Sequence, residues 1–197
     1  MRKEDFFSMD WDKQIYEWKE ILDKIDREVD FFQKIKDGVS REDMKEFLLP
    51  YDLFLTSGMC RIVLISNHLD TVIKISDDES NGVDYNSMEI SNYEKSLRNK
   101  VDKYFCKCES LGTRDIFSIE IMEKVKLMNE DEISEELYGD GEPPEDFGCE
   151  DWVLDEIFEY SSELMKFLDS EGINDIHLGN IGYNNSGRIV IIDYAGY

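Results

Sequence analysis

The sequence predicts an α+β fold with one small antiparallel sheet. Three observations lead to this prediction. A long amphipathic helix comes first, strand-like segments separated by short turns occupy the middle of the chain, and an amphipathic helix followed by a hairpin comes last. We expect an N-terminal helical extension (1–50), a strand-rich lobe (51–125) and a smaller second lobe (126–197).

The composition is that of a folded but strongly acidic protein. The 197 residues carry a formal net charge of −24, and 41% of them are hydrophobic, which is enough apolar material for a core. A charge of this size repels nucleic acids and anionic membranes and favours a cationic ligand or a basic protein partner. An anionic nucleotide would therefore need a local positive pocket.

The cysteines and histidines do not have the spacing of a zinc site. The sequence shows no signal peptide, and no segment reaches the ~18 apolar residues of a membrane span. We therefore expect a cytoplasmic protein with reduced thiols and no membrane partner.

Residues 8–36 predict one long helix that Ser8 or Asp10 can cap and that Gly38 ends. Apolar residues recur along it at alternating spacings of four and three, which makes a seam of about three heptads. The seam consists of Trp11, Ile15, Trp18, Leu22, Ile25, Val29 and Phe32. It either packs on the rest of the domain or forms a coiled-coil contact in a homodimer.

A short second helix precedes the first strands. Ser40 and Asp43 have the spacing of a capping box, and Pro50 follows, which predicts a helix ending near Leu48. The period then changes to that of β-structure, with a glycine turn at Gly58. The predicted strands are 53–55, 61–65 and 71–76.

Lys74 stands inside the last of these strands, between Ile73 and Ile75. A lysine in an apolar strand needs an anionic partner, which can be a carboxylate or a phosphate. The alternative is a half-exposed strand from which the ammonium group reaches water.

A helix is predicted over residues 86–104, with an apolar stripe of Ile90, Tyr93, Leu97 and Val101. A strand pair at 104–108 and 116–122 follows. Residues 129–151 predict an acidic loop with a short helix at 133–138, which is either a solvated segment or a lure for a cationic substrate. Residues 150–170 predict an amphipathic helix that ends at Gly172.

The last part of the sequence combines two acids and an amide around a hairpin. Asp175 and Asn180 stand five positions apart, and Asp193 directly follows the apolar strand 189–192. Such a set can hold a divalent metal and orient a hydroxyl group, which is the chemistry of phosphoryl transfer.

The order of these parts resembles that of the protein-kinase-like superfamily. The parts are a glycine turn, a strand lysine, a helix with a glutamate, a strand pair, a long helix, D-x-x-x-x-N, a hairpin and an aspartate. The loop Asp-Ile-His-Leu-Gly-Asn (175–180) is similar to the D-L-H-x-G-N loop of the aminoglycoside and choline phosphotransferase branch. The resemblance covers about residues 51–195 and implies a two-lobed kinase-like fold with a small N-lobe sheet.

The resemblance implies ATP and Mg²⁺ as cofactors and assigns roles to six residues. Lys74 and the Gly58 turn would hold phosphates, and Glu89 would pair with the lysine, with Glu94 as the alternative. Asp175 would orient the attacking hydroxyl group. The metal ligands would be Asn180 and Asp193.

Three features depart from the family. Ile173 stands where the family often has histidine, Asp-Tyr-Ala (193–195) replaces D-F-G, and the sequence ends at Tyr197. The last feature predicts a minimal, truncated C-lobe that ends just after the metal-binding aspartate and lacks the helices that hold a substrate. A small, unidentified acceptor bound elsewhere is therefore expected.

Three functions stay open on this evidence. The first is an ATP- and Mg²⁺-dependent phosphotransferase acting on a small molecule. The second is a pseudokinase-like binding or regulatory protein without catalysis. The third, which the net charge of −24 favours, is an acidic inhibitor of a basic, nucleic-acid-binding partner.

Overall fold

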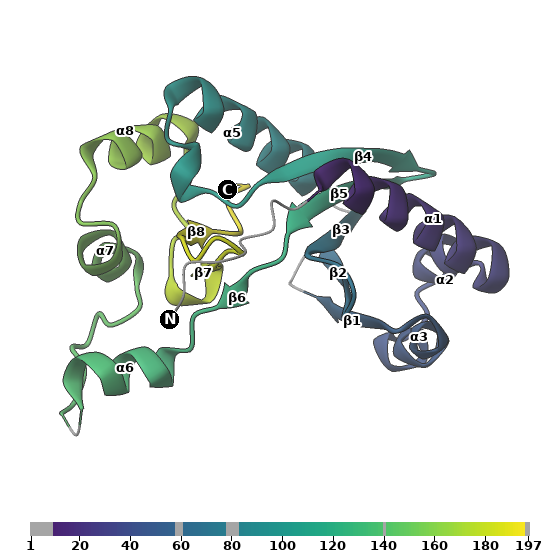
Figure 1. Ribbon diagram of the computed structural model, residues 1–197, viewed down its shortest axis with the longest axis horizontal. Coiled ribbons are helices and arrows are strands. Elements are labelled where there is room, and N and C mark those ends of the chain that lie inside the picture. The colour runs from purple at the N-terminus through teal and green to yellow at the C-terminus, as the bar shows by residue number, and fades with distance from the viewer. Residues whose placement is uncertain (1–9, 58–60, 78–82, 140, 196–197) are drawn as a thin grey trace. The chain divides into compact units, whose positions relative to one another are not determined.

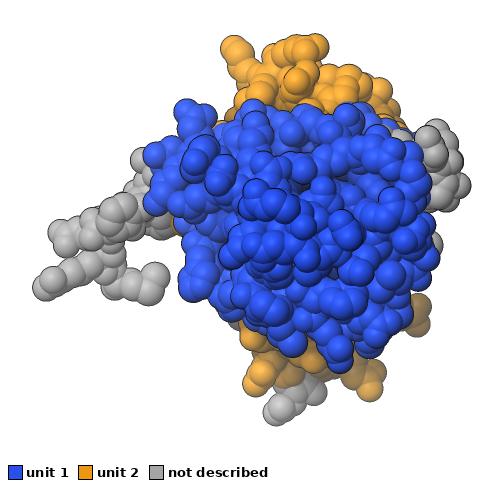
Figure 2. All heavy atoms as spheres, turned by 90° about the vertical axis from the view of Figure 1, so that its right-hand side faces the viewer, with its two compact units in different colours: residues 1–87, 108–124 blue, residues 88–107, 125–197 orange. Residues whose placement is uncertain are grey.

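The computed structural model describes residues 10–57, 61–77, 83–139 and 141–195 (Figure 1). Over this part of the chain the fold is α+β, as the sequence predicts, with a second, three-stranded antiparallel sheet besides the one that was expected. The chain forms two compact units, coloured separately in Figure 2. Unit 1 comprises Met1–Ser87 and Cys108–Lys124, and unit 2 comprises Met88–Lys107 and Val125–Tyr197.

The described residues of unit 1 form a five-stranded antiparallel sheet and the helices that pack against it. The helices are α1 (Trp11–Val29), α2 (Phe31–Lys36) and α3 (Arg41–Leu48), followed by the 3₁₀ turn η1 (Leu49–Tyr51). The strands are β1 (Leu53–Ser57), β2 (Arg61–Ser66), β3 (Thr71–Asp77), β4 (Cys108–Arg114) and β5 (Phe117–Glu123). Their order in the sheet is β1-β2-β3-β5-β4.

The single helix predicted over 8–36 is broken into α1 and α2. Asp30 adopts a left-handed conformation with φ of 52°, and its N–H donates to the carbonyl of Asp26 at 2.8 Å, which closes α1. At the other end Asp10 caps the helix by accepting the N–H of Lys13 at 3.1 Å. Ser8, the other predicted cap, lies outside the described residues.

The heptad seam packs inside unit 1. Its central residues Trp18, Leu22 and Ile25 are almost fully buried, and all seven seam residues belong to the core of this unit or pack against it. The Trp18 indole N–H also donates to Oγ1 of Thr71 on β3 at 2.8 Å. The first predicted alternative, packing on the domain, is confirmed, and a dimer through this helix would have to use its other face.

The predicted capping box and the first three strands are confirmed. Ser40 Oγ accepts the N–H of Asp43 at 3.2 Å at the start of α3. The first strand of the later pair is displaced from its predicted place at 104–108, because β4 begins only at Cys108 and continues through a bulge between Ser110 and Gly112.

The strand register gives the sheet two different faces, because successive side chains point to opposite sides. One face carries apolar residues such as Leu64, Ile73 and Ile121, which form the core with the helices α1, α2 and α3 (Figure 1). The opposite face includes Lys74 and Glu120, which stand directly across from each other on β3 and β5.

Unit 2 contains a small three-stranded sheet in the order β6-β7-β8. Its helical elements are α6 (Glu130–Tyr138), α7 (Glu150–Trp152), the π-helical turn η3 (Val153–Ile157) and α8 (Ser162–Glu171). Its strands are β6 (Lys126–Leu127), β7 (Ile181–Tyr183) and β8 (Ile189–Ile191), with the 3₁₀ turn η4 (Leu178–Asn180) before β7. Helix α5 (Tyr85–Asn99) begins in unit 1 and continues in unit 2, and the turn η2 (Asp102–Tyr104) follows it.

The predicted helix over 150–170 is interrupted. Glu159 and Tyr160 have φ values of 51° and 44°, so the chain turns between η3 and α8. Ser161 then caps α8 by accepting the N–H of Leu164, and Gly172 ends that helix as predicted. Among the described residues, none of the helices combines the length and the apolar character that crossing a membrane requires.

Candidate functional site

The loop that begins at Asp175 holds the side chain of Asn180 in one orientation. The Asn180 Nδ2 donates to the backbone carbonyl of Asp175 at 2.9 Å and lies 3.5 Å from Oδ2 of the same residue. A carbonyl oxygen can only accept, so the amide nitrogen must face it and the amide oxygen must point away. This loop geometry leaves Oδ1 of Asn180 directed away from Asp175.

His177 stabilises the turn between these two residues. Its Nδ1 accepts the N–H of Gly179 at 3.1 Å, so the neutral ring carries its proton on Nε2, which lies 3.7 Å from Oδ1 of Asp175. A Cβ atom at Gly179 would come within 2.8 Å of the imidazole ring, so any other residue there would displace the His177 ring from this position. His177 therefore serves as a turn residue of this loop.

The hairpin of β7 and β8 brings Asp193 close to Asn180. Ile192 donates its N–H to the backbone carbonyl of Asn180 at 2.9 Å, and Asp193 is the next residue along the chain. Asn184 closes the hairpin by accepting the N–H of Arg188 at 3.0 Å. The predicted residues of unit 2 are thus gathered at one end of this hairpin, and all three are partly exposed.

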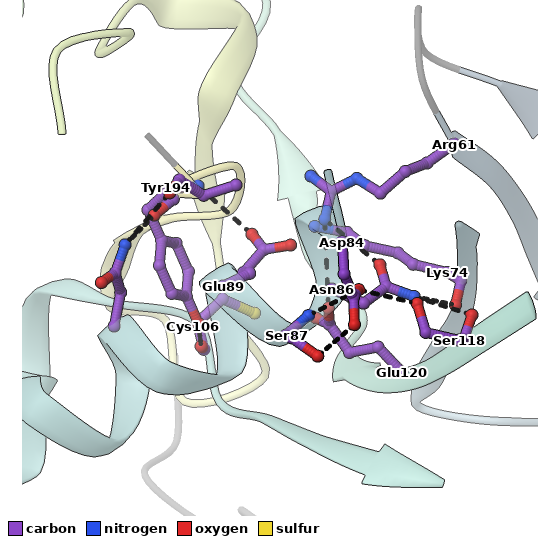
Figure 3. A network of polar contacts seen from close by, with 12 residues as sticks. Arg61, Lys74, Asp84, Asn86, Ser87, Glu89, Cys106, Ser118, Glu120 and Tyr194 are labelled. Atoms are coloured by element: carbon purple, nitrogen blue, oxygen red, sulfur yellow. Dashed lines mark hydrogen bonds and ion pairs between the residues drawn. The ribbon is translucent and has the colours of Figure 1, made fainter. Parts of the chain in front are cut away.

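Helix α5 holds the segment that follows Asp193 (Figure 3). Oε1 of Glu89 accepts the N–H of Tyr194 at 3.2 Å, and Nδ2 of Asn92 donates to the Tyr194 carbonyl at 2.8 Å. The Tyr194 hydroxyl donates to the carbonyl of Cys106 at 2.6 Å, and its ring is fully buried. Both polar groups of the Tyr194 backbone are therefore engaged by one helix.

The buried side of α5 differs from the predicted apolar stripe. Leu97 is half exposed, whereas Glu89 and Ser96 are fully buried. Glu89 is therefore not an ordinary solvated acid. Glu94, the alternative to it, is exposed and forms an ion pair with Arg98 at 3.3 Å one turn along the helix.

Lys74 is buried in unit 1, with only 7% of its surface exposed, so the prediction that it might reach water is wrong. Its cross-strand neighbour Glu120 is fully buried, and Nη1 of Arg61 lies 3.9 Å from Oε2 of that glutamate. Sequence reasoning missed both Arg61 and Glu120. Charged residues at single positions of otherwise apolar strands were the available signal.

Polar contacts anchor the first turn of α5 on β3, which carries Lys74, and on the neighbouring strand β5 (Figure 3). Nδ2 of Asn86 donates to the carbonyls of Lys74 and Ser118 at 3.1 and 3.0 Å. Asp84 precedes the helix and accepts the N–H of Ser87 at 2.9 Å and the hydroxyl of Ser118 at 2.8 Å. Burial raises the pKa of Asp84, but these hydrogen bonds outweigh it, so the net shift is downward.

Further acids of unit 2 lie around Asp175. The pKa of Glu150 is raised, first by its burial and then by the negative charges of Asp151, Asp175 and Asp169. Asp175 therefore lies close enough to Glu150 to raise the pKa of that residue, so at least one further acid stands near Asp175.

The metal-binding groups that the structure offers are oxygen atoms. In the described parts of the chain, no three or more histidine, cysteine, aspartate or glutamate side chains are grouped to hold a metal ion. The candidates are the amide of Asn180 and the carboxylate of Asp193, which are hard ligands of the kind that Mg²⁺ prefers. Gly58, the predicted glycine of the phosphate-binding turn, lies outside the described residues.

Comparison with known proteins does not assign the chain to a family. No protein-family model and no curated protein sequence matches it. The evidence for the candidate site is therefore the geometry described above.

Proposed function

We propose that this protein binds a nucleoside triphosphate with Mg²⁺ and transfers the terminal phosphate to a small molecule, on a kinase-like two-lobed fold. The observation that carries the proposal is the fixed amide of Asn180. Its nitrogen is held by Asp175 at 2.9 Å, and its backbone carbonyl accepts the N–H of Ile192, next to Asp193. An amide oxygen and a carboxylate gathered at one hairpin end suit a magnesium ion.

The order of the described elements supports the proposal. A strand with the buried Lys74 precedes a helix with the buried Glu89, and the strand pair β4–β5 follows. Helix α8 then precedes the Asp175 loop, the β7–β8 hairpin and Asp193. This is the order that the resemblance to the kinase-like superfamily implies.

The protein groups have distinct tasks in the proposed reaction. Mg²⁺ keeps several waters and phosphate oxygens among its six ligands, so Asn180 and Asp193 suffice as protein ligands. Asp175 would accept a hydrogen bond from the attacking hydroxyl group and orient it, since phosphoryl transfer depends mainly on positioning and charge stabilisation. Glu150, whose pKa Asp175 helps to raise, is a second acid near Asp175, and this favours an acceptor with a positive charge.

Unit 1 would contribute to nucleotide binding through the polar face of its sheet. Lys74 would place its positive charge on the phosphates. On the same face, Val63, Ile65 and Val72 are partly exposed apolar residues, which suit contact with a base. Glu89 would act through the Tyr194 amide that it binds and, as the resemblance implies, by pairing with Lys74. ATP and reduced thiols are both expected in the cytoplasm, which is where we place the reaction.

Calorimetric titration of ATP and GTP, with and without Mg²⁺, tests this function. The wild-type protein should bind one of them in a Mg²⁺-dependent way, and Asp193→Asn should weaken that binding at least about tenfold because a charged metal ligand is lost. The matched control Asp131→Asn removes an exposed carboxylate of α6 and should bind like the wild type. Absence of Mg²⁺-dependent binding of either nucleotide to the wild type would falsify the proposal.

Turnover separates the enzyme from a binding protein without catalysis. Release of ADP in the presence of a panel of hydroxyl-bearing amines should depend on Asp175, and Asp175→Asn should abolish it while leaving nucleotide affinity nearly unchanged. Nucleotide binding without any such release would select the pseudokinase-like alternative.

A further inference from the structure

We propose that a pocket of unit 1 binds a short aliphatic polyamine, with Tyr16 and Tyr51 against its carbon chain and the carboxylates of Glu17 and Glu20 beside its ammonium groups. All the residues that line this pocket belong to unit 1, and none of them has a part in the proposed phosphoryl transfer. Polyamine binding can therefore be tested whether or not the protein transfers phosphate.

The pocket is a cavity of about 300 Å³ between α1, η1 and the turn that joins β2 to β3. Helix α1 contributes Tyr16, Glu17, Glu20 and Ile21, which share one side of the helix because they lie on adjacent turns. The β2–β3 turn contributes Leu69, so Ile21 and Leu69 form apolar walls. The volume lies at the small end of the range for ligand pockets, about 300–1,000 Å³, and therefore suits a small molecule.

The aromatic side chains of the pocket suit a ligand that is both apolar and cationic. The Tyr51 hydroxyl donates to Oε2 of Glu28 at 2.8 Å, which orients the ring. Nζ of Lys24 lies 5.3 Å from the centroid of that ring, within the ~6 Å over which an aromatic face attracts an ammonium group. Tyr16 is 64% exposed, so it can contact a ligand without leaving the core.

Two carboxylates give one side of the pocket a negative charge. Glu17 lies 3.5 Å from Nζ of Lys13, one turn earlier on α1, and both side chains are more than one-third exposed. Such an exposed ion pair contributes little free energy, so an ammonium group of a ligand can replace it. Glu20 is exposed and stands three positions after Glu17, on the same side of the helix.

Other polar groups of the lining are engaged within the chain. The Ser66 carbonyl accepts a hydrogen bond from Nζ of Lys124 at 2.9 Å, and Nε2 of His68 lies 2.8 Å from Oδ2 of Asp52. The two glutamates and the two tyrosines are therefore the groups that remain for a ligand. A chain with a net charge of −24 also draws polycations toward it.

An NMR titration with three compounds that share a four-carbon chain tests the inference. They are 1,4-diaminobutane, butylamine and 1,4-butanediol, which are a dication, a monocation and a neutral molecule at neutral pH. The methyl signals of Ile21 and Leu69 report on the pocket, and those of Leu137, exposed on the acidic helix α6, report on diffuse attraction. In about 150 mM salt, which screens diffuse attraction, 1,4-diaminobutane should shift only the pocket signals and saturate them. It should bind about threefold tighter than butylamine, and the diol should not saturate the signals.

Paired carboxylate variants show whether the binding belongs to the pocket. Glu17→Gln/Glu20→Gln should weaken the binding of 1,4-diaminobutane about tenfold, because both carboxylates beside the ammonium groups are lost. The matched control Glu42→Gln/Glu46→Gln removes two exposed carboxylates of α3, outside the pocket, and should bind like the wild type.

Two further variants test the aromatic contact in opposite directions. Tyr51→Leu should weaken binding about threefold or more, as expected for the loss of a cation–π contact. Lys24→Gln removes the ammonium group that lies over the Tyr51 ring, so it should tighten binding about twofold. Loss of folding cannot produce such a gain. Unchanged affinity in both variants would exclude Tyr51 from the site and contradict the proposal.

Three results would overturn the proposed site as a whole. If the pocket signals do not saturate, or if the Leu137 signals shift to the same extent, polyamines are attracted only diffusely. If the diol binds as tightly as the diamine, the pocket is an apolar hollow that does not select a cation. If the α3 control weakens binding as much as Glu17→Gln/Glu20→Gln does, only the total charge of the chain matters.

Discussion

One face of the sheet in unit 1 buries Leu64, Ile73 and Ile121 against the helices α1 to α3, whereas the other face buries Arg61, Lys74 and Glu120. The two faces share the same strands and the same register, so the backbone does not distinguish them. Side-chain chemistry alone does. The apolar face stabilises the unit by roughly 25 cal/mol for each Å² removed from water.

The charged face cannot be explained in the same way. Burying ionised groups costs free energy that ion pairing at best offsets, and apolar residues of similar size would often be neutral or better. The difference between the faces teaches that burial of the apolar face stabilises unit 1 directly, whereas burial of the charged face has to be offset by the contacts of its charged groups.

Trp18→Ala should produce the largest loss of stability. Trp18 is fully buried at the apolar face and donates to Oγ1 of Thr71 at 2.8 Å, so its removal leaves a cavity and removes one of the two hydrogen bonds of that hydroxyl group, which still donates to Gln14. We expect a loss of about 3–5 kcal/mol in the free energy of unfolding, measured by urea titration. Tyr16→Ala, on the exposed side of the same helix, is the control and should change stability by less than about 1 kcal/mol. If Trp18→Ala changes the free energy of unfolding only slightly, packing of the helices against the apolar face contributes little to stability.

Replacing the whole charged set should separate stability from binding. The triple variant Arg61→Met/Lys74→Met/Glu120→Leu exchanges three buried charged side chains for apolar ones of similar volume. We expect the unfolding free energy to stay equal or to rise by about 1–4 kcal/mol, while MgATP binding weakens because the ammonium group of Lys74 is lost. Unfolding by urea and calorimetry on the same samples measure the two effects. A clear loss of stability would mean that the charges hold the fold together and that the two faces have the same purpose.

The two faces also differ in how well the sequence predicts them. The apolar residues of α1 recur with a seven-residue repeat, so periodicity identifies the buried side of this helix, although it does not decide whether that side packs on the domain or on a second chain. The break at Asp30 does not, because a left-handed aspartate leaves the apolar period unchanged. The prediction of the buried side of α5 was also wrong. That side is polar and includes Glu89 and Ser96, and hydrophobic periodicity cannot detect a polar buried side.

The candidate site shows the same limit. The residues of the Asp175 loop stand in a short motif and could be identified in the sequence, as could Lys74. Arg61 and Glu120 are adjacent to that lysine only through the pairing of β2, β3 and β5, and strand pairing between distant segments is not visible in one sequence. The three-dimensional structure was therefore needed to show that Arg61 and Glu120 lie on the same face as Lys74.

Asn180→Ala should change binding far more than stability. The side chain is partly exposed and contributes one hydrogen bond to the Asp175 carbonyl, so its loss should cost about 1 kcal/mol of unfolding free energy. Mg²⁺-dependent nucleotide affinity should fall about tenfold, because an oxygen ligand is lost. Asn185→Ala, an exposed asparagine in the hairpin turn, is the matched control and should leave both unchanged. Equal affinity with and without the Asn180 amide would remove it from the metal site.

Asp84→Asn should have the smallest effect and should depend on pH. The folded-state pKa of Asp84 lies below its ordinary value of 3.8, so its carboxylate stabilises the fold above that pH and loses its contribution as the pH falls through the lower folded value. We expect the variant to be less stable than the wild type by about 0.5–1 kcal/mol near neutral pH, as for the loss of a helix cap, with the gap closing in acid. Urea titrations at several pH values measure this difference in unfolding free energy. Ser118→Ala removes one of the hydrogen bonds to Asp84, so it should make the difference smaller. If the difference in unfolding free energy stays constant into acid, the charge of Asp84 does not anchor α5 to the charged face. The protonated carboxyl group would then cap the helix as well as the carboxylate does.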